Sequence, residues 1–218
     1  MMKTLTLITA FTTFYLFSSA QIKKDAVLLG GHISFGNNKT STIPATNESK
    51  NNSAVFNIMV GKAFKQNQVF GLYGGYGKSK YESDFTGNKA TAINNTYAAG
   101  IFYRHYKNLS KVFYFFGEAS VGFNGTKNEN VTYNQQPPTK NTSITNGVAL
   151  GIIPGISYQV SNKLQLEVLM AQFAALQYGT TKNTANNGSV SKISGFSFST
   201  NLNTSLLNSF ALGFKFIL

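Results

Sequence analysis

The chain ends on Ser209-Phe-Ala-Leu-Gly-Phe-Lys-Phe-Ile-Leu218, in which large apolar residues alternate with small or polar ones. Such alternation predicts a β-strand with one apolar and one polar face, because successive side chains of a strand point to opposite sides. One face would carry Phe210, Leu212, Phe214, Phe216 and Leu218, and the other Ser209, Ala211, Gly213 and Lys215. The closing residues therefore predict a strand that lies between two different environments.

Seven earlier segments show the same alternation, and the lengths of the connections between them indicate the fold. We expect strands at residues 26–37, 53–65, 69–80, 93–106, 112–125, 143–160, 163–178 and 204–218. The short connections are 66–68, 107–111 and 161–162, and the long ones are roughly 38–52, 81–92, 126–142 and 179–203. Tight turns on one side and long loops on the other are typical of barrels in bacterial outer membranes. The sequence therefore predicts an all-β fold, an eight-stranded antiparallel up-and-down transmembrane β-barrel with four long extracellular loops.

The first twenty residues are typical of a secretory signal peptide. Lys3 supplies the positive charge, residues 5–17 form an apolar run, and Ser18-Ser19-Ala20 offers a cleavage site. A retained N-terminal anchor is the alternative, but this run is shorter than the ~18 residues that a transmembrane helix needs. We therefore expect a cleaved signal peptide at residues 1–20 and an outer-membrane barrel domain at residues 21–218.

The amino-acid composition excludes several kinds of functional site and binding partner. The chain has no cysteine, which excludes disulfides, thiolate metal sites, cysteine nucleophiles and a lipoprotein anchor. The formal net charge is +12 at pH 7, yet the lysines are spread singly through Asn-, Thr- and Ser-rich connections. We therefore expect no nucleic-acid binding. Basic loops that face anionic lipopolysaccharide are the better interpretation.

The parity of each segment indicates which face meets lipid. In the seventh segment, Leu164, Leu166 and Val168 oppose Gln165 and Glu167. The large apolar face should meet lipid, and the small and polar face should fill the lumen. Aromatic residues near both ends of the segments would form two interfacial girdles.

Two residues interrupt this parity. Pro154 lies inside a predicted strand without an N–H to donate, and a bulge with Gly155 would accommodate it. Lys62 shares parity with lipid-facing residues, so either its side chain snorkels or a bulge shifts the register. The register around both residues stays open at this point.

Charged residues in the middle of strands are few. Of 7 acidic residues, only Glu118 and Glu167 lie there, and parity points both into the lumen. A buried carboxylate needs a cation or several donors. We expect a lumen ion-pair network of Arg104, Glu118, Glu167 and Lys215, joined by Tyr106 and Tyr114. A structural plug is the favoured interpretation, since an eight-stranded lumen is just wide enough for side chains to fill. A proton or ion path is the alternative.

Catalytic groups are scarce as well. His32 and Ser34 share a face, and Glu118 could complete a triad, but a His-x-Ser pair is a weak motif. The sequence has no metal-ligand spacing and no phosphate-binding glycine motif. We therefore expect no enzyme activity, no metal and no cofactor.

The last strand also predicts an assembly signal. Gly213, Phe214, Phe216 and Leu218 resemble the C-terminal signal that the barrel-assembly machinery recognises. Two positions depart from that signal: the final residue is Leu218 where Phe is usual, and Ala211 stands where a polar residue is expected. The machinery is nonetheless an expected partner during biogenesis.

Several stretches together resemble a known family. They are Gly100-Ile-Phe-Tyr-Arg104-His-Tyr106, Phe113-Tyr-Phe-Phe-Gly117-Glu118-Ala-Ser-Val-Gly122, Gly151-Ile-Ile-Pro154-Gly155-Ile-Ser-Tyr158, which runs on to Lys163-Leu164 and Glu167, and the closing Leu212-Gly213-Phe214. They resemble the small outer-membrane β-barrel proteins common in Bacteroidetes, of the OmpX and OmpA-barrel type. The resemblance implies an eight-stranded barrel with a filled lumen, and it transfers no catalytic residue.

Three functions remain for such a chain. The leading expectation is a monomeric, non-enzymatic barrel with a structural or adhesion-like role, carried by loops whose extracellular partner is unknown. It would contact outer-membrane lipid and lipopolysaccharide. The alternatives are a small passive pore and a soluble, secreted, lipocalin-like carrier.

Overall fold

The computed structural model describes residues 22–42, 47–85, 88–133, 137–170, 172–200 and 211–218. Ten β-strands account for most of them. Their bounds are β1 Val27–Thr42, β2 Asn47–Lys65, β3 Gln68–Phe85, β4 Asn88–Asn108, β5 Phe113–Thr132, β6 Thr139–Ser161, β7 Leu164–Leu169, β8 Ala174–Thr184, β9 Val190–Thr200 and β10 Ala211–Ile217. Within these ranges no helix is long and apolar enough to cross a membrane. The predicted signal peptide lies outside the described residues.

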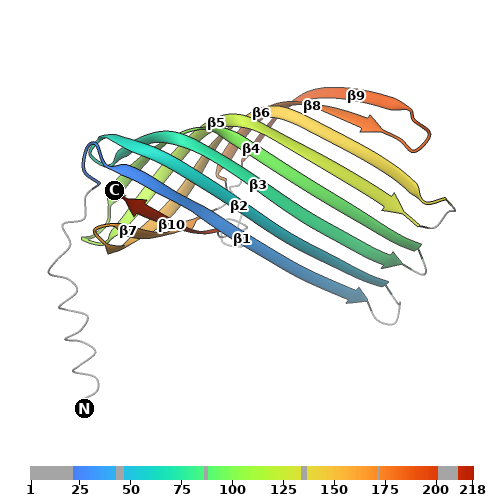
Figure 1. Ribbon diagram of the computed structural model, residues 1–218, viewed down its shortest axis with the longest axis horizontal. Coiled ribbons are helices and arrows are strands. Elements are labelled where there is room, and N and C mark those ends of the chain that lie inside the picture. The colour runs from blue at the N-terminus through green and yellow to red at the C-terminus, as the bar shows by residue number, and fades with distance from the viewer. Residues whose placement is uncertain (1–21, 43–46, 86–87, 134–136, 171, 201–210) are drawn as a thin grey trace, which may run out of the picture.

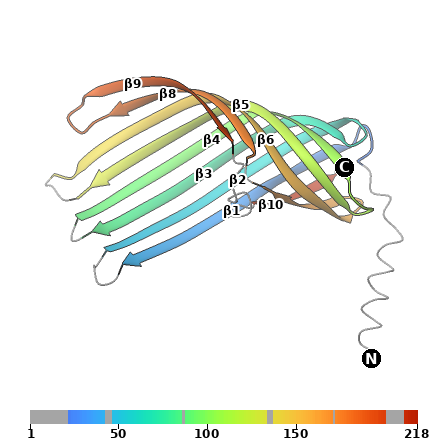
Figure 2. The same ribbon diagram turned by 180° about the vertical axis from the view of Figure 1, so that it is seen from behind.

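The strands form one antiparallel sheet that is closed at one end and open at the other (Figures 1 and 2). From β1 to β6 each strand pairs with the next, and β6 pairs with β7, β7 with β10, and β10 with β1. This makes a ring through eight strands, which we call the closed end. At the open end β8 and β9 extend the sheet from β6, and in the described ranges β9 pairs only with β8. The all-β antiparallel prediction is confirmed.

The predicted seventh strand, residues 163–178, is wrong as a single strand. β7 pairs with the second half of β6 and β8 with the first half, so both lie along the same edge of β6. Four residues, 170–173, separate β7 from β8, whereas only Ile153 and Pro154 separate their partners on β6. Pro154 and Gly155 themselves pair with Gly117 and Phe116 of β5 without a register shift, so the bulge predicted at this pair is not found, and the break lies in the strand beside it. Of the predicted eighth strand, the structure describes only its end, as β10.

The register around Lys62 is regular. Lys62 pairs with Val27 on β1 and with Phe70 on β3, and the register shifts only between Ala63 and Lys65. Its side chain lies on the outside, where Nζ is 3.1 Å from a carboxylate oxygen of Asp25. The snorkelling interpretation therefore describes this lysine better than a bulge at its own position.

The four long loops were the clearest error of the sequence interpretation. Most of these polar residues continue the strands as long hairpins, and only residues 185–189 separate β8 from β9. There Gly188 has φ +79 and donates its N–H to the carbonyl of Ala185 at 2.9 Å. We call residues 36–53, 78–96, 126–145 and 180–194 the hairpin extensions. They were missed because both of their faces are polar, which hides the alternation that marks a strand.

The two ends of the sheet have opposite polarity. At the closed end the inward side chains form a core that includes Met59, Phe102, Tyr114 and Phe116, and the outward ones are apolar and exposed. In the hairpin extensions the lysines and acids all point outward. The inward face there consists mainly of Asn, Thr and Ser, with no charged side chain among the described residues. Buried charged side chains are therefore confined to the closed end among the described residues.

Candidate functional site

Arg104 of β4 occupies the centre of the closed end with its side chain fully buried. Its Nε donates to Oε2 of Glu118 at 2.9 Å. Its Nη1 donates to both carboxylate oxygens of Glu167, at 2.9 and 2.8 Å. One guanidinium thus links β4 to β5 and to β7 across the interior.

The sheet register explains why these charges meet. Arg104 lies directly opposite Glu118 in the β4–β5 pairing. Glu167 comes from the far side of the ring, where it pairs with Ser157 of β6 and Gly213 of β10. A long planar cation with five donors can span this width and satisfy two carboxylates at once.

Lys215 completes the group from the ring-closing strand. Its Nζ lies 3.2 Å from Oε1 of Glu167 and donates to the Tyr106 hydroxyl at 2.9 Å. That hydroxyl also accepts from Arg104 at 3.1 Å and donates to Glu167 at 3.1 Å. The structure therefore brings together all four residues predicted for the lumen. Two cations and two carboxylates balance formally, which is the condition for burying them.

Aromatic rings seal the network on its sides. The Arg104 guanidinium carbon lies 4.1 Å from the centroid of the Phe116 ring, a cation–π distance. Tyr106 packs edge-on against Tyr114 with centroids 6.2 Å apart. The Tyr114 hydroxyl donates to Gln159 at 3.2 Å, so, unlike in the prediction, this tyrosine contacts the aromatic shell and not the charges.

The structure shows no direct polar contacts among the three residues of the weak triad hypothesis, His32, Ser34 and Glu118, all of which it describes. His32 Nε2 lies 2.7 Å from the side-chain nitrogen of Asn57, and no hydrogen bond or ion pair in the described residues joins His32 to Ser34 or Glu118. The described residues also hold no group of three or more metal-ligating side chains. The chemistry of the closed end is that of a balanced and internally satisfied charge cluster.

Three of the four predicted assembly residues lie on β10, the ring-closing strand, and Leu218 follows it directly. Phe214 and Phe216 point outward, with ring centroids 5.9 Å apart, and Leu218 exchanges backbone hydrogen bonds with Val27 at 2.8 and 3.1 Å. A Cβ on Gly213 would lie 3.1 Å from the Gly31 carbonyl oxygen and 3.2 Å from Leu169 Cδ1. A larger residue would therefore crowd the β1–β10 seam.

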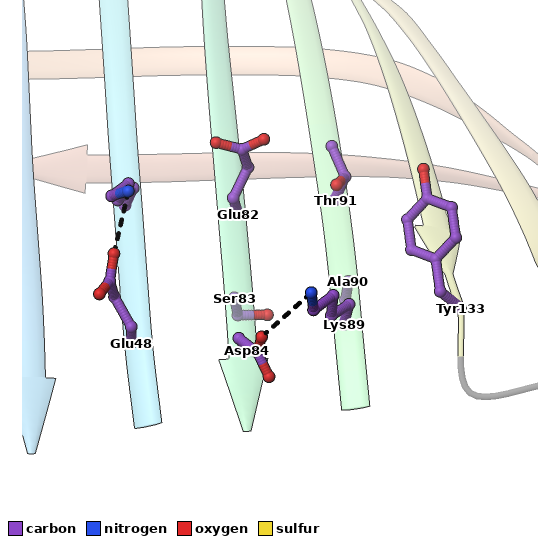
Figure 3. Close-up of a pocket in the computed structure, with 9 residues that line it drawn as sticks. Glu48, Glu82, Ser83, Asp84, Lys89, Ala90, Thr91 and Tyr133 are labelled. Carbon is purple, nitrogen blue, oxygen red and sulfur yellow. Dashed lines mark ion pairs between the residues drawn. The ribbon is translucent and has the colours of Figure 1, made fainter. Parts of the chain in front are cut away.

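A shallow groove of about 550 Å³ lies on the outward face near the hairpin tips (Figure 3). It is lined by Glu48, Lys50, Glu82, Ser83, Asp84, Lys89, Ala90, Thr91 and Tyr133. Its three acids are already paired: Glu48 with Lys50 at 3.0 Å, Glu82 with Lys80 at 2.6 Å and Asp84 with Lys89 at 3.6 Å. Hydrogen bonds from Lys50 and then Lys39 lower the pKa of the Glu48 carboxyl. The sequence interpretation missed this surface because it treated these residues as loops.

Two solved structures resemble the fold. A major outer membrane protein from Thermus thermophilus is 11% identical with a TM-score of 0.47, over 88% of this chain and 99% of that one. The translocator domain of autotransporter NalP from Neisseria meningitidis is also 11% identical, with a TM-score of 0.39, over 96% of this chain and 91% of that one. No family model and no curated protein matches the sequence. Likenesses this low transfer no function.

Proposed function

We propose that this protein is a monomeric, non-enzymatic β-barrel integral to the bacterial outer membrane. Its closed end would cross the membrane with a lumen plugged by the charge network. Its hairpin extensions would project from the cell and serve a structural or adhesion-like role toward an extracellular partner. The observation that carries the proposal is the reversal of polarity at the closed end, where charges face inward and apolar side chains face outward.

The outward apolar surface is too extensive for water. Large side chains between 38% and 70% exposed cover most strands of the ring; they include Leu29, Ile33, Ile58, Val60, Leu72, Ile101, Phe115, Val121, Leu150, Ile152, Leu166 and Leu212. Proteins in water seldom expose contiguous apolar patches above a few hundred Å². A hydrocarbon environment removes this cost, and a sheet ring satisfies the backbone without water.

Aromatic pairs border this surface. Phe113 and Tyr158 lie 5.0 Å apart near the short turns, and Tyr97 and Phe123 lie 6.3 Å apart toward the hairpin extensions. Aromatic girdles at both interfaces are a recurring feature of outer-membrane barrels. This arrangement supports a position of the membrane's hydrocarbon core between the two aromatic pairs.

The alternatives fit less well. A passive pore needs an open lumen, whereas the side chains of Arg104, Tyr106, Tyr114 and Phe116 are all 1% exposed or less. A soluble carrier needs an apolar interior for its ligand, whereas this interior holds two ion-paired carboxylates. The closed end favours a filled membrane barrel over both.

Heat-modifiability tests the proposal. The full chain is expressed in a Gram-negative host, outer-membrane fractions are isolated, and unboiled and boiled samples are compared by electrophoresis. We expect the protein in the outer-membrane fraction, with a mobility that changes on boiling. Recovery in the soluble periplasmic fraction without detergent would overturn the proposal. A steady conductance in planar bilayers would show that the lumen is an open pore and contradict the plugged lumen.

A further inference from the structure

The outward face of the β8–β9 hairpin changes from apolar to cationic along its length. Four cross-strand pairs follow one another on this face: Leu176 with Phe198, Tyr178 with Phe196, Thr180 with Ser194, and Lys182 with Lys192. The three aromatic rings of the first two pairs are strongly exposed, Tyr178 at 59%, Phe196 at 69% and Phe198 at 63%. The two hydroxyls of the third pair lie 2.9 Å apart. The hairpin thus presents apolar, hydroxyl and cationic levels in that order.

The lysine pair at the end of this series has no counter-charge. Lys182 and Lys192 face each other directly in the antiparallel register, where like charges destabilise a sheet. No ion pair joins either lysine to an acid in the described residues, and no acidic residue follows Glu167 in the sequence. The neighbour of Lys182 on β6 is Ile144.

Six of the seven other outward lysines of the hairpin extensions contact an acid, and among the described residues Lys78 alone of these seven has no ion pair. Lys39 and Lys50 both contact Glu48, at 3.2 and 3.0 Å. Lys127 contacts Glu129 at 2.8 Å. The uncompensated pair is therefore a local feature of β8–β9 and does not simply follow from the basic composition of the chain.

We propose that this face binds a phosphorylated lipid of the outer leaflet. Its acyl chains would lie along Tyr178, Phe196 and Phe198, and its phosphate would lie between Lys182 and Lys192. A phosphate monoester carries about −1.5 to −2 charges at neutral pH, which matches two ammonium groups. The hydroxyls of Thr180 and Ser194 stand between these levels, where headgroup hydroxyls would meet them. The inference rests on the proposed membrane location.

The apolar level distinguishes a lipid from a free anion. Inorganic phosphate would use only the two lysines, whereas a lipid also covers the exposed rings on the other side of the Thr180–Ser194 pair. β9 is also the free edge of the sheet in the described ranges, so a lipid can approach it without displacing a neighbouring strand.

The test uses the full mature chain folded in a zwitterionic detergent, with fluorescent phosphatidic acid as the probe. We expect phosphatidic acid to bind more tightly than phosphatidylcholine. The double variant Lys182→Gln/Lys192→Gln should bind phosphatidic acid about 30-fold more weakly, because each basic side chain near an anionic surface contributes about fivefold. The matched control Lys39→Gln/Lys50→Gln removes the same charge from the compensated lysines and should stay within about twofold of wild type.

A charge reversal provides a second, opposite readout. Lys192→Glu places a carboxylate opposite Lys182, so the hairpin should unfold at a higher temperature without lipid while phosphatidic acid binding is lost. Equal losses in both double variants, or no loss in either, would overturn the proposal. Competition by inorganic phosphate as effective as that by the lipid would also overturn it, in favour of a free anion.

These results are separable from failure of the proposed function. A chain that shows no heat-modifiable form and stays soluble without detergent contradicts the membrane location itself. A chain that folds in detergent but binds phosphatidic acid independently of Lys182 and Lys192 contradicts only the lipid site.

Discussion

The closed end and the hairpin extensions belong to the same strands, yet they place their charges on opposite faces. At the closed end Arg104, Glu118, Glu167 and Lys215 point inward among aromatic rings. In the hairpin extensions lysines and acids point outward, and neutral amides and hydroxyls line the inner face. Strand geometry dictates only that successive side chains point to opposite faces. Which face carries the apolar side chains therefore indicates which side of the sheet is away from water. The difference marks a boundary between environments along single strands.

The largest expected effect comes from removing the cation at the centre of the closed end. Arg104→Leu leaves Glu118 buried without its cation and Glu167 with only Lys215, so we expect a loss of about 3–5 kcal/mol in the free energy of unfolding. Urea unfolding in detergent measures it. Lys50→Gln, in the hairpin extensions, is the control and should cost far less. Equal losses of unfolding free energy in the two variants would contradict the difference drawn between the closed end and the hairpin extensions.

A charge placed on the outward face tests the boundary directly. Leu72, which is 57% exposed on the closed end, should meet lipid, so Leu72→Lys should cost about 2–4 kcal/mol in a bilayer. Thr142 lies outward in the hairpin extensions opposite Glu129, and Thr142→Lys should cost almost nothing. Folding into lipid vesicles at graded urea concentrations compares them. A harmless lysine at position 72 would place the closed end in water.

A smaller effect should follow from removing one hydroxyl of the charge network. The Tyr106 hydroxyl contacts Arg104, Glu167 and Lys215, and Tyr106→Phe deletes these three hydrogen bonds while keeping the ring. Because hydrogen bonds to charged groups contribute about 1.5–3 kcal/mol each and losses in a network are not additive, we expect a loss of about 2 kcal/mol. Tyr97→Phe, which deletes the exposed hydrogen bond to Asn146, is the matched control. A similar small loss in both would mean that water replaces the hydroxyl at the closed end.

The smallest effect concerns pH at the hairpin tips. Lysine hydrogen bonds lower the pKa of Glu48, so its contribution is present above the ordinary carboxyl pKa of about 4.3 and lost as the pH falls below it. Glu48→Gln should therefore unfold slightly more easily than wild type at pH 7, and the two should converge near pH 3. Thermal unfolding at both pH values measures the difference. A gap that widens in acid would contradict the assigned pairing.

Parity arguments predicted the closed end well because one face there is apolar. The alternation around Glu118 and Glu167 was enough to point both inward, and two mid-strand cations left few ways to neutralise them. The same reasoning failed for residues 38–52 and 126–142. There lysine alternates with asparagine or threonine, and hydropathy separates such residues poorly. The break between β7 and β8 was also out of reach, since it depends on where β6 changes its neighbour, between Ile152 and Gly155.

The seam between β1 and β10 joins the first strand of the sheet to the last, with Leu28 opposite Ile217. Contacts so distant in sequence form late and slowly, because the intervening chain must be ordered first. Lys215 lies on this seam and also reaches Glu167 of the neighbouring β7, so the strand that closes the ring carries one cation of the charge network. A one-residue slip would turn Lys215 outward and place a neighbouring apolar side chain opposite the carboxylate. A misregistered β10 would thus leave the buried charges unbalanced, and this penalty favours the register in which Lys215 points inward.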